Sequence, residues 1–181
     1  FVNGTGTQAR FSSPSAVCLD SLGNVLVTDT GNWVIRKITT AGVVTTFAGT
    51  GVSGEADGFT TTATFPSSMN SIISDASGNI LVGEASRIRK ISGTSVTTTA
   101  YLTSNNQIAI DSAGTIYTCE TDHINMVSYY TGGARINVFK GPALVPAMGD
   151  GTGPQARFGR PGALRVMADE TLYVADKQSY T

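Results

Sequence analysis

Residues 3–49 read NGTGTQARFSSPSAVCLDSLGNVLVTDTGNWVIRKITTAGVVTTFAG, and this stretch decides the fold because the rest of the chain repeats it. It holds four short runs in which apolar and small or polar side chains alternate with a period of two, as at Val25 and Val27. Such alternation, with many β-branched residues, is typical of half-buried strands. Turns such as Gly23-Asn24 tolerate the positive φ of tight hairpins. The stretch is therefore predicted to form four antiparallel strands.

The same pattern recurs three more times along the 181 residues. Residues 150–158 (DGTGPQARF) repeat residues 3–11 without a gap, and Pro161 then falls on the position of Pro14. We divide the chain into units at about 1–50, 51–100, 101–147 and 148–181, the last of them partial. Four strands in each ~45–50 residues predict an all-β fold, either a β-propeller or a related β-solenoid. One unit alone cannot bury both of its faces, and stacking the next unit does so.

The repeat resembles the NHL repeat. The matching motifs are the Gly-rich opening, Ala-Arg-Phe, a proline, Asp-x-x-Gly-Asn at 20–24 and Asp-Thr-Gly-Asn-x-x-Ile-Arg-Lys-Ile at 29–38. The second unit departs at Gly83–Ser86, where the turn is shortened, and the third departs most, at Glu120–His123. The resemblance implies a propeller of six four-stranded blades, of which about four are visible here. We therefore expect a piece of a longer chain or, failing that, self-assembly through open propeller edges.

The composition narrows the class of protein. A charged fraction of 14 % and 21 glycines favour many short strands and tight turns, and a net charge of −1 gives no strong attraction for nucleic acid or anionic membranes. No apolar run approaches the ~20 residues of a membrane span. Few lysines and many threonines favour an extracellular or cell-surface location, where the sequon Asn3-Gly4-Thr5 would allow glycosylation. Cys18 and Cys119 are expected to be buried, unpaired thiols.

An acidic residue ends the second strand of every unit, at Asp29, Glu84, Glu120 and Asp176. These carboxylates either form a ring of charge or, in the interpretation that we prefer, cap the following turn and pair with a backbone N–H or an Arg. The basic pairs Arg36-Lys37 and Arg89-Lys90 also recur in register. Some proteins that the repeat resembles bind RNA on a basic face, so RNA binding is one alternative function.

Ser15, Asn70 and Asn106 occupy one position of the first strand, with Gly162 in the fourth unit. First strands line the channel of a propeller, so these side chains are predicted to lie near its mouth. The amides would help to hold a hard cation such as Ca²⁺, or bind a polar ligand, or only line the channel with water. No other cofactor is predicted, and His123, the one histidine, is expected in a turn.

The function predicted from these features is a non-enzymatic binding or scaffolding module that presents loops to a protein or glycan partner, not to nucleic acid. The Gly-rich segments Gly49–Gly58 and Gly141–Gly153 are the loops expected to make the contacts. The main alternative is an enzyme of the propeller lyase or lactonase type with an axial metal. Such enzymes need carboxylates or histidines at the channel mouth, and the positions of Ser15, Asn70 and Asn106 supply neither.

Overall fold

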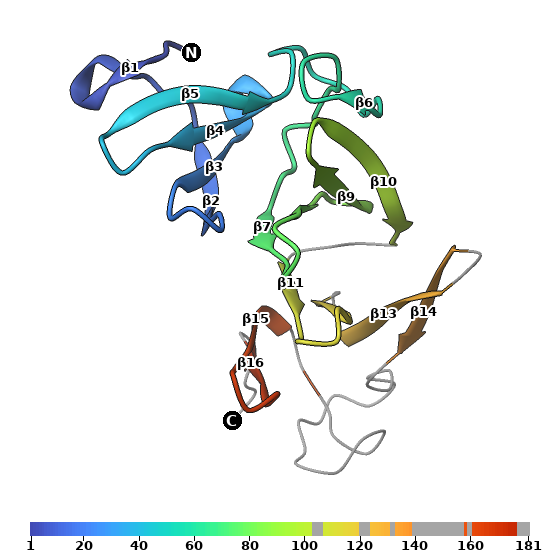
Figure 1. The fold of residues 1–181 in the computed structure, drawn as a ribbon. Coiled ribbons are helices and arrows are strands. Elements are labelled where there is room, and N and C mark those ends of the chain that lie inside the picture. The colour runs from blue at the N-terminus through green and yellow to red at the C-terminus, as the bar shows by residue number, and fades with distance from the viewer. Residues whose placement is uncertain (103–106, 120–123, 131–132, 139–157, 159–160, 177–181) are drawn as a thin grey trace. The chain divides into compact units, whose positions relative to one another are not determined.

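The structure, a computed structural model, describes residues 1–102, 107–119, 124–130, 133–138, 158 and 161–176 (Figure 1). Its strands form four sheets, each of them antiparallel. The chain divides into two compact units, Phe1–Tyr101 and Leu102–Thr181. The first unit contains the two sheets that we call sheet 1 and sheet 2, and the second contains sheet 3 and sheet 4.

Sheets 1 and 2 have the same strand order, which follows from their shared sequence pattern. Sheet 1 runs β1-β5-β4-β3-β2, formed by Gly4–Thr5 (β1), Pro14–Leu19 (β2), Val25–Asp29 (β3), Val34–Ile38 (β4) and Val43–Ala48 (β5). Sheet 2 runs β6-β10-β9-β8-β7, formed by Gly58–Phe59 (β6), Ser71–Ser74 (β7), Ile80–Gly83 (β8), Arg87–Ser92 (β9) and Ser95–Tyr101 (β10). Two short 3-10 helices, Gly6–Gln8 (η1) and Thr30–Asn32 (η2), flank strands of sheet 1.

The second unit of the chain repeats the hairpins of the first. Sheet 3 contains Gln107–Ile110 (β11), Ile116–Cys119 (β12), Ile124–Tyr130 (β13) and Gly133–Val138 (β14) in sequence order. Sheet 4 consists of Pro161–Val166 (β15) and Leu172–Asp176 (β16). In β15–β16, Pro161 lies opposite Asp176, as Pro14 lies opposite Asp29 in β2–β3, so the repeat is kept at the level of register.

Sheets 1 and 2 have five strands rather than the four predicted for each unit. Their Gly-rich opening segments add a strand of two residues to the outer edge: Gly4–Thr5 pairs with β5, and Gly58–Phe59 pairs with β10. The alternation signal needs at least four residues, so pairs this short leave no trace in the sequence.

The turn between β2 and β3 of sheet 1 and the turn between β7 and β8 of sheet 2 are each held by an aspartate. Asp20 Oδ1 accepts hydrogen bonds from the N–H groups of Leu22 and Asn24, at 2.9 and 2.8 Å. Asp75 makes the same contacts with Ser77 and Asn79. Gly23 follows with φ +78°, a conformation that glycine adopts without strain, so the predicted hairpin turn is confirmed.

One hydrophobic core is shared by sheets 1 and 2. Sheet 1 contributes one face, sheet 2 contributes one face, and the segment between them fills the centre with fully buried Phe65 and Met69. The core consists of Leu26, Ile35, Ala48, Ala63, Phe65, Met69, Ile72, Ile80, Val82, Ile91 and Val96. Because both sheets contribute to it, neither one buries its apolar face alone.

The Cys18 thiol is free and half-buried, and Cys119 is buried. Burial raises the pKa of the Cys18 thiol to about 11. Among the described residues, no helix has the length and hydropathy that a membrane span requires.

Candidate functional site

The carboxylate that ends β3 forms a buried ion pair with the arginine of β4. Asp29 Oδ2 lies 3.1 Å from Arg36 Nη1, and both side chains are fully buried. Asp29 also accepts hydrogen bonds from the Ser12 N–H at 2.7 Å and from Asn32 Nδ2 at 2.8 Å. These contacts satisfy a charge that would otherwise be costly to bury. The structure thus shows the local pairing preferred from the sequence.

Arg36 also ties the opening segment of the chain to sheet 1. Its guanidinium donates to the backbone oxygens of Val2 and Arg10 at 3.0 Å and to Asn3 Oδ1 at 2.9 Å. The rings of Phe1 and Phe11 each lie with their centroids 5.0 Å from the guanidinium carbon. The arginine is therefore a clamp between β4 and the Gly-rich opening.

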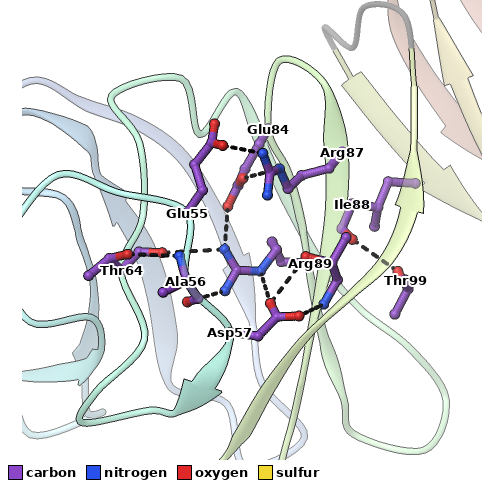
Figure 2. Close-up of polar contacts among 10 residues, drawn as sticks. Glu55, Ala56, Asp57, Thr64, Glu84, Arg87, Ile88, Arg89 and Thr99 are labelled. Carbon is purple, nitrogen blue, oxygen red and sulfur yellow. Dashed lines mark hydrogen bonds and ion pairs between the residues drawn. The ribbon is translucent and has the colours of Figure 1, made fainter.

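Sheet 2 repeats this clamp around Arg89 of β9 (Figure 2). Arg89 pairs with Glu84 at 3.5 Å and with Asp57 at 2.9 Å, and it donates to the backbone oxygens of Ala56 at 2.8 Å and Thr64 at 3.3 Å. The Phe65 ring lies 5.2 Å from the guanidinium carbon, in the place of Phe11. The sequence analysis predicted that the acidic residue pairs with an arginine, but it did not predict the contacts of Asn3 and Asp57 with that arginine. Both residues precede a glycine in the opening segment, and this shared position was the signal available in the sequence.

The clamp of sheet 2 carries more charge than that of sheet 1. The shortened turn lacks the amide corresponding to Asn32, and Arg87 lies there instead, 3.5 Å from Glu84 and paired with the half-exposed Glu55 (Figure 2). Burial raises the pKa of Glu84 to about 7, because the arginine contacts are too long to outweigh the lost hydration. The Glu84 carboxyl is therefore expected to change its protonation state near neutral pH.

The basic pairs do not form an exposed basic face. Arg36 and Arg89 are fully buried in the clamps, which leaves the two lysines. Lys37 is half-buried, and Lys90 lies 3.8 Å from Asp75. The observation that favoured RNA binding is therefore absent from sheets 1 and 2.

Two of the three predicted channel residues come close together. Ser15 Oγ donates to the Met69 carbonyl at 2.6 Å and lies 2.8 Å from Thr28 Oγ1, which places it beside the residue that precedes Asn70. The Asn70 N–H donates to the Gly83 carbonyl at 2.8 Å. Asn106 lies outside the described residues, as do Glu120, His123 and the loop Gly141–Gly153. Within the described part of the chain, no three His, Cys, Asp or Glu side chains are grouped so that they could hold a metal.

The loop Gly49–Gly58 is anchored along its length. The N–H groups of Gly49, Gly54 and Ala56 donate to Thr60, Phe65 and Thr64, at 2.8 to 3.1 Å. The clamp of Arg89 holds the end of the loop through Ala56 and Asp57. Between the anchors the Val52 side chain is 63 % exposed, and the Phe1 ring, 51 % exposed, lies against Gly51. We call Phe1, Gly51 and Val52 the loop patch.

The comparisons with known proteins agree with this geometry. The NHL repeat family matches residues 11–33, which cover the β2–β3 hairpin and η2. The resemblance to NHL-repeat propellers is thereby confirmed, and the fold is that of a β-propeller. None of the curated proteins matches the chain.

Three solved structures illustrate the range of similar propellers. An auxiliary nutrient binding protein from Bacteroides ovatus has a TM-score of 0.69 at 17 % identity, with 93 % of this chain and 43 % of that chain covered. Virginiamycin B lyase from Staphylococcus aureus scores 0.61 at 16 % identity, with 93 % and 50 % covered. A gluconolactonase from Xanthomonas campestris scores 0.63 at 14 % identity, with 90 % and 56 % covered. The chain therefore spans about half the length of the structures it matches.

Proposed function

We propose that this protein is a non-enzymatic binding module that presents the loop patch to a glycan or protein partner, as part of an extracellular or cell-surface protein. The observation that carries the proposal is an apolar patch on a loop whose backbone is already fixed. A loop that is already held in place by hydrogen bonds loses little conformational freedom when a partner binds. Less of the binding free energy is therefore spent on ordering the loop.

The internal use of the recurring charges supports the same function. Asp29, Arg36, Glu84 and Arg89 repeat in register because they hold each opening segment on its sheet, so their repetition requires no substrate. The similarity to nutrient binding proteins from Bacteroides supports a ligand-binding role.

A glycan is the partner that the patch fits best. The ring of Phe1 has its centroid 5.0 Å from the Arg36 guanidinium carbon and lies near Gly51, while Phe1 remains 51 % exposed. Aromatic faces combine a large apolar contact area with little side-chain entropy, and they are enriched where proteins bind ligands.

The binding test uses a panel of soluble cello-, xylo- and malto-oligosaccharides, with affinity measured by calorimetry. The variant Val52→Asp is expected to weaken binding of a recognised oligosaccharide at least about tenfold, or about 1.4 kcal/mol. The matched control is Leu22→Asp, since Leu22 is 81 % exposed on the Asp20–Asn24 turn and should leave affinity unchanged. Equal effects of the two variants would contradict the loop patch, and no binding to any sugar would favour a protein partner.

The enzymatic alternative rests on the similarity to a lyase and a gluconolactonase. We expect no hydrolysis of glucono-δ-lactone and no ring opening of a streptogramin B, with or without added Ca²⁺ or Mg²⁺. Turnover of either compound above the uncatalysed rate would overturn the non-enzymatic proposal.

A further inference from the structure

The loop Gly49–Gly58 is anchored to β9 by two arginines (Figure 2). Arg87 pairs with the Glu55 carboxylate, and Arg89 donates to the Ala56 carbonyl at 2.8 Å. The Glu55 side chain is half-exposed, whereas Arg89 is fully buried. These contacts therefore join the surface of the loop to the interior of sheet 2.

A buried carboxylate, Glu84, contacts the same two arginines. It is 1 % exposed, and its two oxygens lie 3.5 Å from Arg89 Nη1 and 3.5 Å from Arg87 Nε. Glu84 Oε2 has no hydrogen-bond partner among the described residues. In sheet 1, by contrast, the corresponding Asp29 has three polar contacts of 2.7 to 3.1 Å. The surroundings of Glu84 thus compensate a negative charge less completely than those of Asp29.

The charges beside Glu84 balance without it. They are two cations of β9 and two anions of the loop: Arg87, Arg89, Glu55 and Asp57. Residues 60–70 hold no ionisable side chain, and β10 holds only Tyr101, whose ring centroid lies 5.5 Å from the Arg87 guanidinium carbon. Lys90, the remaining charge of β9, pairs with Asp75 at 3.8 Å. A charge on Glu84 would therefore give this cluster one negative charge in excess.

Ionised Glu84 would compete with the loop for the arginines. It would attract the guanidinium groups that now hold Glu55 and the Ala56 carbonyl, and it would repel the Glu55 carboxylate. Release of the loop would also let water reach Glu84, which removes the cost of burying its charge. The ionised form of Glu84 is therefore more stable beside a released loop than beside an anchored one.

We propose that the clamp of sheet 2 anchors the loop in a pH-dependent way: protonated Glu84 keeps residues 54–56 on sheet 2, and ionised Glu84 shifts them toward release. The hydrogen bonds that would open are those of the Gly54 and Ala56 N–H groups, at 3.1 and 2.9 Å. The two ends of the loop have other anchors, because the Gly49 N–H donates to Thr60 and Asp57 accepts from the Thr98 N–H.

The pH range of the shift follows from the two states of the loop. Burial raises the pKa of Glu84 from 4.5 to about 7 in the anchored state, and hydration in the released state brings it back toward 4.5. The anchored state is therefore most favoured below pH 4.5. The released state then gains up to about tenfold for each pH unit, or about 300-fold in total, and the shift is complete above about pH 7.

Hydrogen exchange measured by NMR on the protein without ligand tests the loop directly. After correction for the intrinsic pH dependence of exchange, the protection factors of the Gly54 and Ala56 N–H groups should fall by up to about 300-fold between about pH 4.5 and pH 8. Glu84→Gln stays neutral and should show no fall. Asp57→Asn removes a charge that raises the pKa of Glu84, so its fall should occur at lower pH. Lys90→Gln, which changes a charge of β9 outside the cluster, should leave the profile unchanged.

Two results would overturn the proposal. The first is a constant protection factor of Gly54 and Ala56 in the wild type, which requires no variant to fold. The second is that these two N–H groups exchange at the same rate as those of β8 and respond equally to low concentrations of urea. Release of the loop exposes little surface and should be insensitive to urea, whereas unfolding of the whole sheet is not.

The consequence for ligand binding rests on the proposed function, because Gly51 and Val52 of the loop patch belong to this loop. The affinity for a recognised oligosaccharide should follow the anchored fraction of the loop, so it should be higher at about pH 5 than at about pH 8. Glu84→Gln should remove that difference. Absence of binding at both pH values would contradict the proposed function alone, since the exchange experiment contains no ligand.

Discussion

Two buried threonine hydroxyls differ in whether they have a hydrogen-bond partner, and this difference decides whether each one stabilises the fold. Thr28 on β3 and Thr118 on β12 are both fully buried. Thr28 Oγ1 accepts from the Ala16 N–H at 2.9 Å and lies 2.8 Å from Ser15 Oγ. Thr118 Oγ1 has no hydrogen-bond partner among the described residues, and its register position holds valine in the other sheets, at Val27, Val82 and Val174.

The substitution of each threonine by valine should therefore have opposite effects. Thr118→Val removes an unsatisfied buried hydroxyl and is expected to raise the free energy of unfolding by about 1 kcal/mol. Thr28→Val leaves the Ala16 N–H without its acceptor and is expected to lower it by about 1–3 kcal/mol. Urea unfolding of both variants measures the difference, and a loss of stability in Thr118→Val would contradict the assignment.

Glu84 makes stability depend on pH in a direction opposite to that of most carboxylates. Its pKa is raised from 4.5 to about 7 by burial, against the pull of Arg89 and Arg87 and with smaller contributions from Glu55 and Asp57. Between these values the folded protein keeps a proton that the unfolded chain has released. The stability that Glu84 contributes is thus complete below pH 4.5 and is lost as the pH rises through about 7.

The variant Glu84→Gln isolates this effect because it stays neutral at every pH. Relative to the variant, the wild type should lose up to about 3 kcal/mol of unfolding free energy between about pH 4.5 and pH 8, measured by urea titrations. Glu55→Gln is the control, since it removes an exposed carboxylate of the same cluster. A difference that does not change with pH would mean that the arginines keep Glu84 ionised throughout.

At the scale of elements, the clamps explain why each opening segment lies on its sheet. A two-residue strand such as Gly4–Thr5 contributes too few hydrogen bonds to hold itself in place. Arg36 adds three hydrogen bonds to this segment, from a side chain that the Asp29 carboxylate orients inside the sheet. The hydrogen bonds of Arg36 therefore stabilise the pairing of β1 with β5, which would be weak by itself.

The effects of removing the two members of the clamp of sheet 1 should not be additive. Arg36→Met leaves the Asp29 carboxylate buried without its cation and is expected to destabilise the protein by about 3–5 kcal/mol. The double variant Arg36→Met/Asp29→Asn should cost less than the sum of the single variants, as measured by chemical denaturation. Lys37→Met, a change at the half-buried neighbour, is the control. Additive effects would show that the pair is not coupled.

The longer strands were largely predictable from the sequence, but the two-residue strands at the outer edges of sheets 1 and 2 were not. The strands Val25–Asp29 and Val34–Ile38 and the Asp20–Asn24 turn lie where period-two alternation and turn residues predicted them. The strands β1 and β6 were missed because their pairing partners lie about forty residues away, and only a long-range contact defines them.

At the scale of the whole molecule, sheets 1 and 2 share one hydrophobic core, and we expect them to unfold as one cooperative unit. Phe65 is fully buried in the core that they share, although it belongs to neither sheet. Residues in such a position couple the stability of both neighbours, because a cavity there removes contacts from each.

Phe65→Ala is therefore expected to lower the unfolding free energy by about 3–5 kcal/mol. Hydrogen exchange should show that amides of β3 and β8 lose protection together. Phe59→Ala, at an exposed aromatic residue of sheet 2, should change stability by no more than about 0.5 kcal/mol. Loss of protection in sheet 2 alone would show that the two sheets fold independently.

The sequence by itself determined the repeat, the strand positions, the NHL resemblance and the local pairing of Asp29 and Glu84 with arginine. These features are written in residues close together in the chain, where alternation and turn chemistry act. Only the tertiary structure decided that Arg36 and Arg89 are buried rather than offered to RNA, that Ser15 contacts Met69, and that Val17 is exposed while Ile72 is covered. Burial depends on which sheet packs on which face, and equivalent positions of a repeat, such as Val17 and Ile72, carry apolar residues whether or not a neighbour covers them.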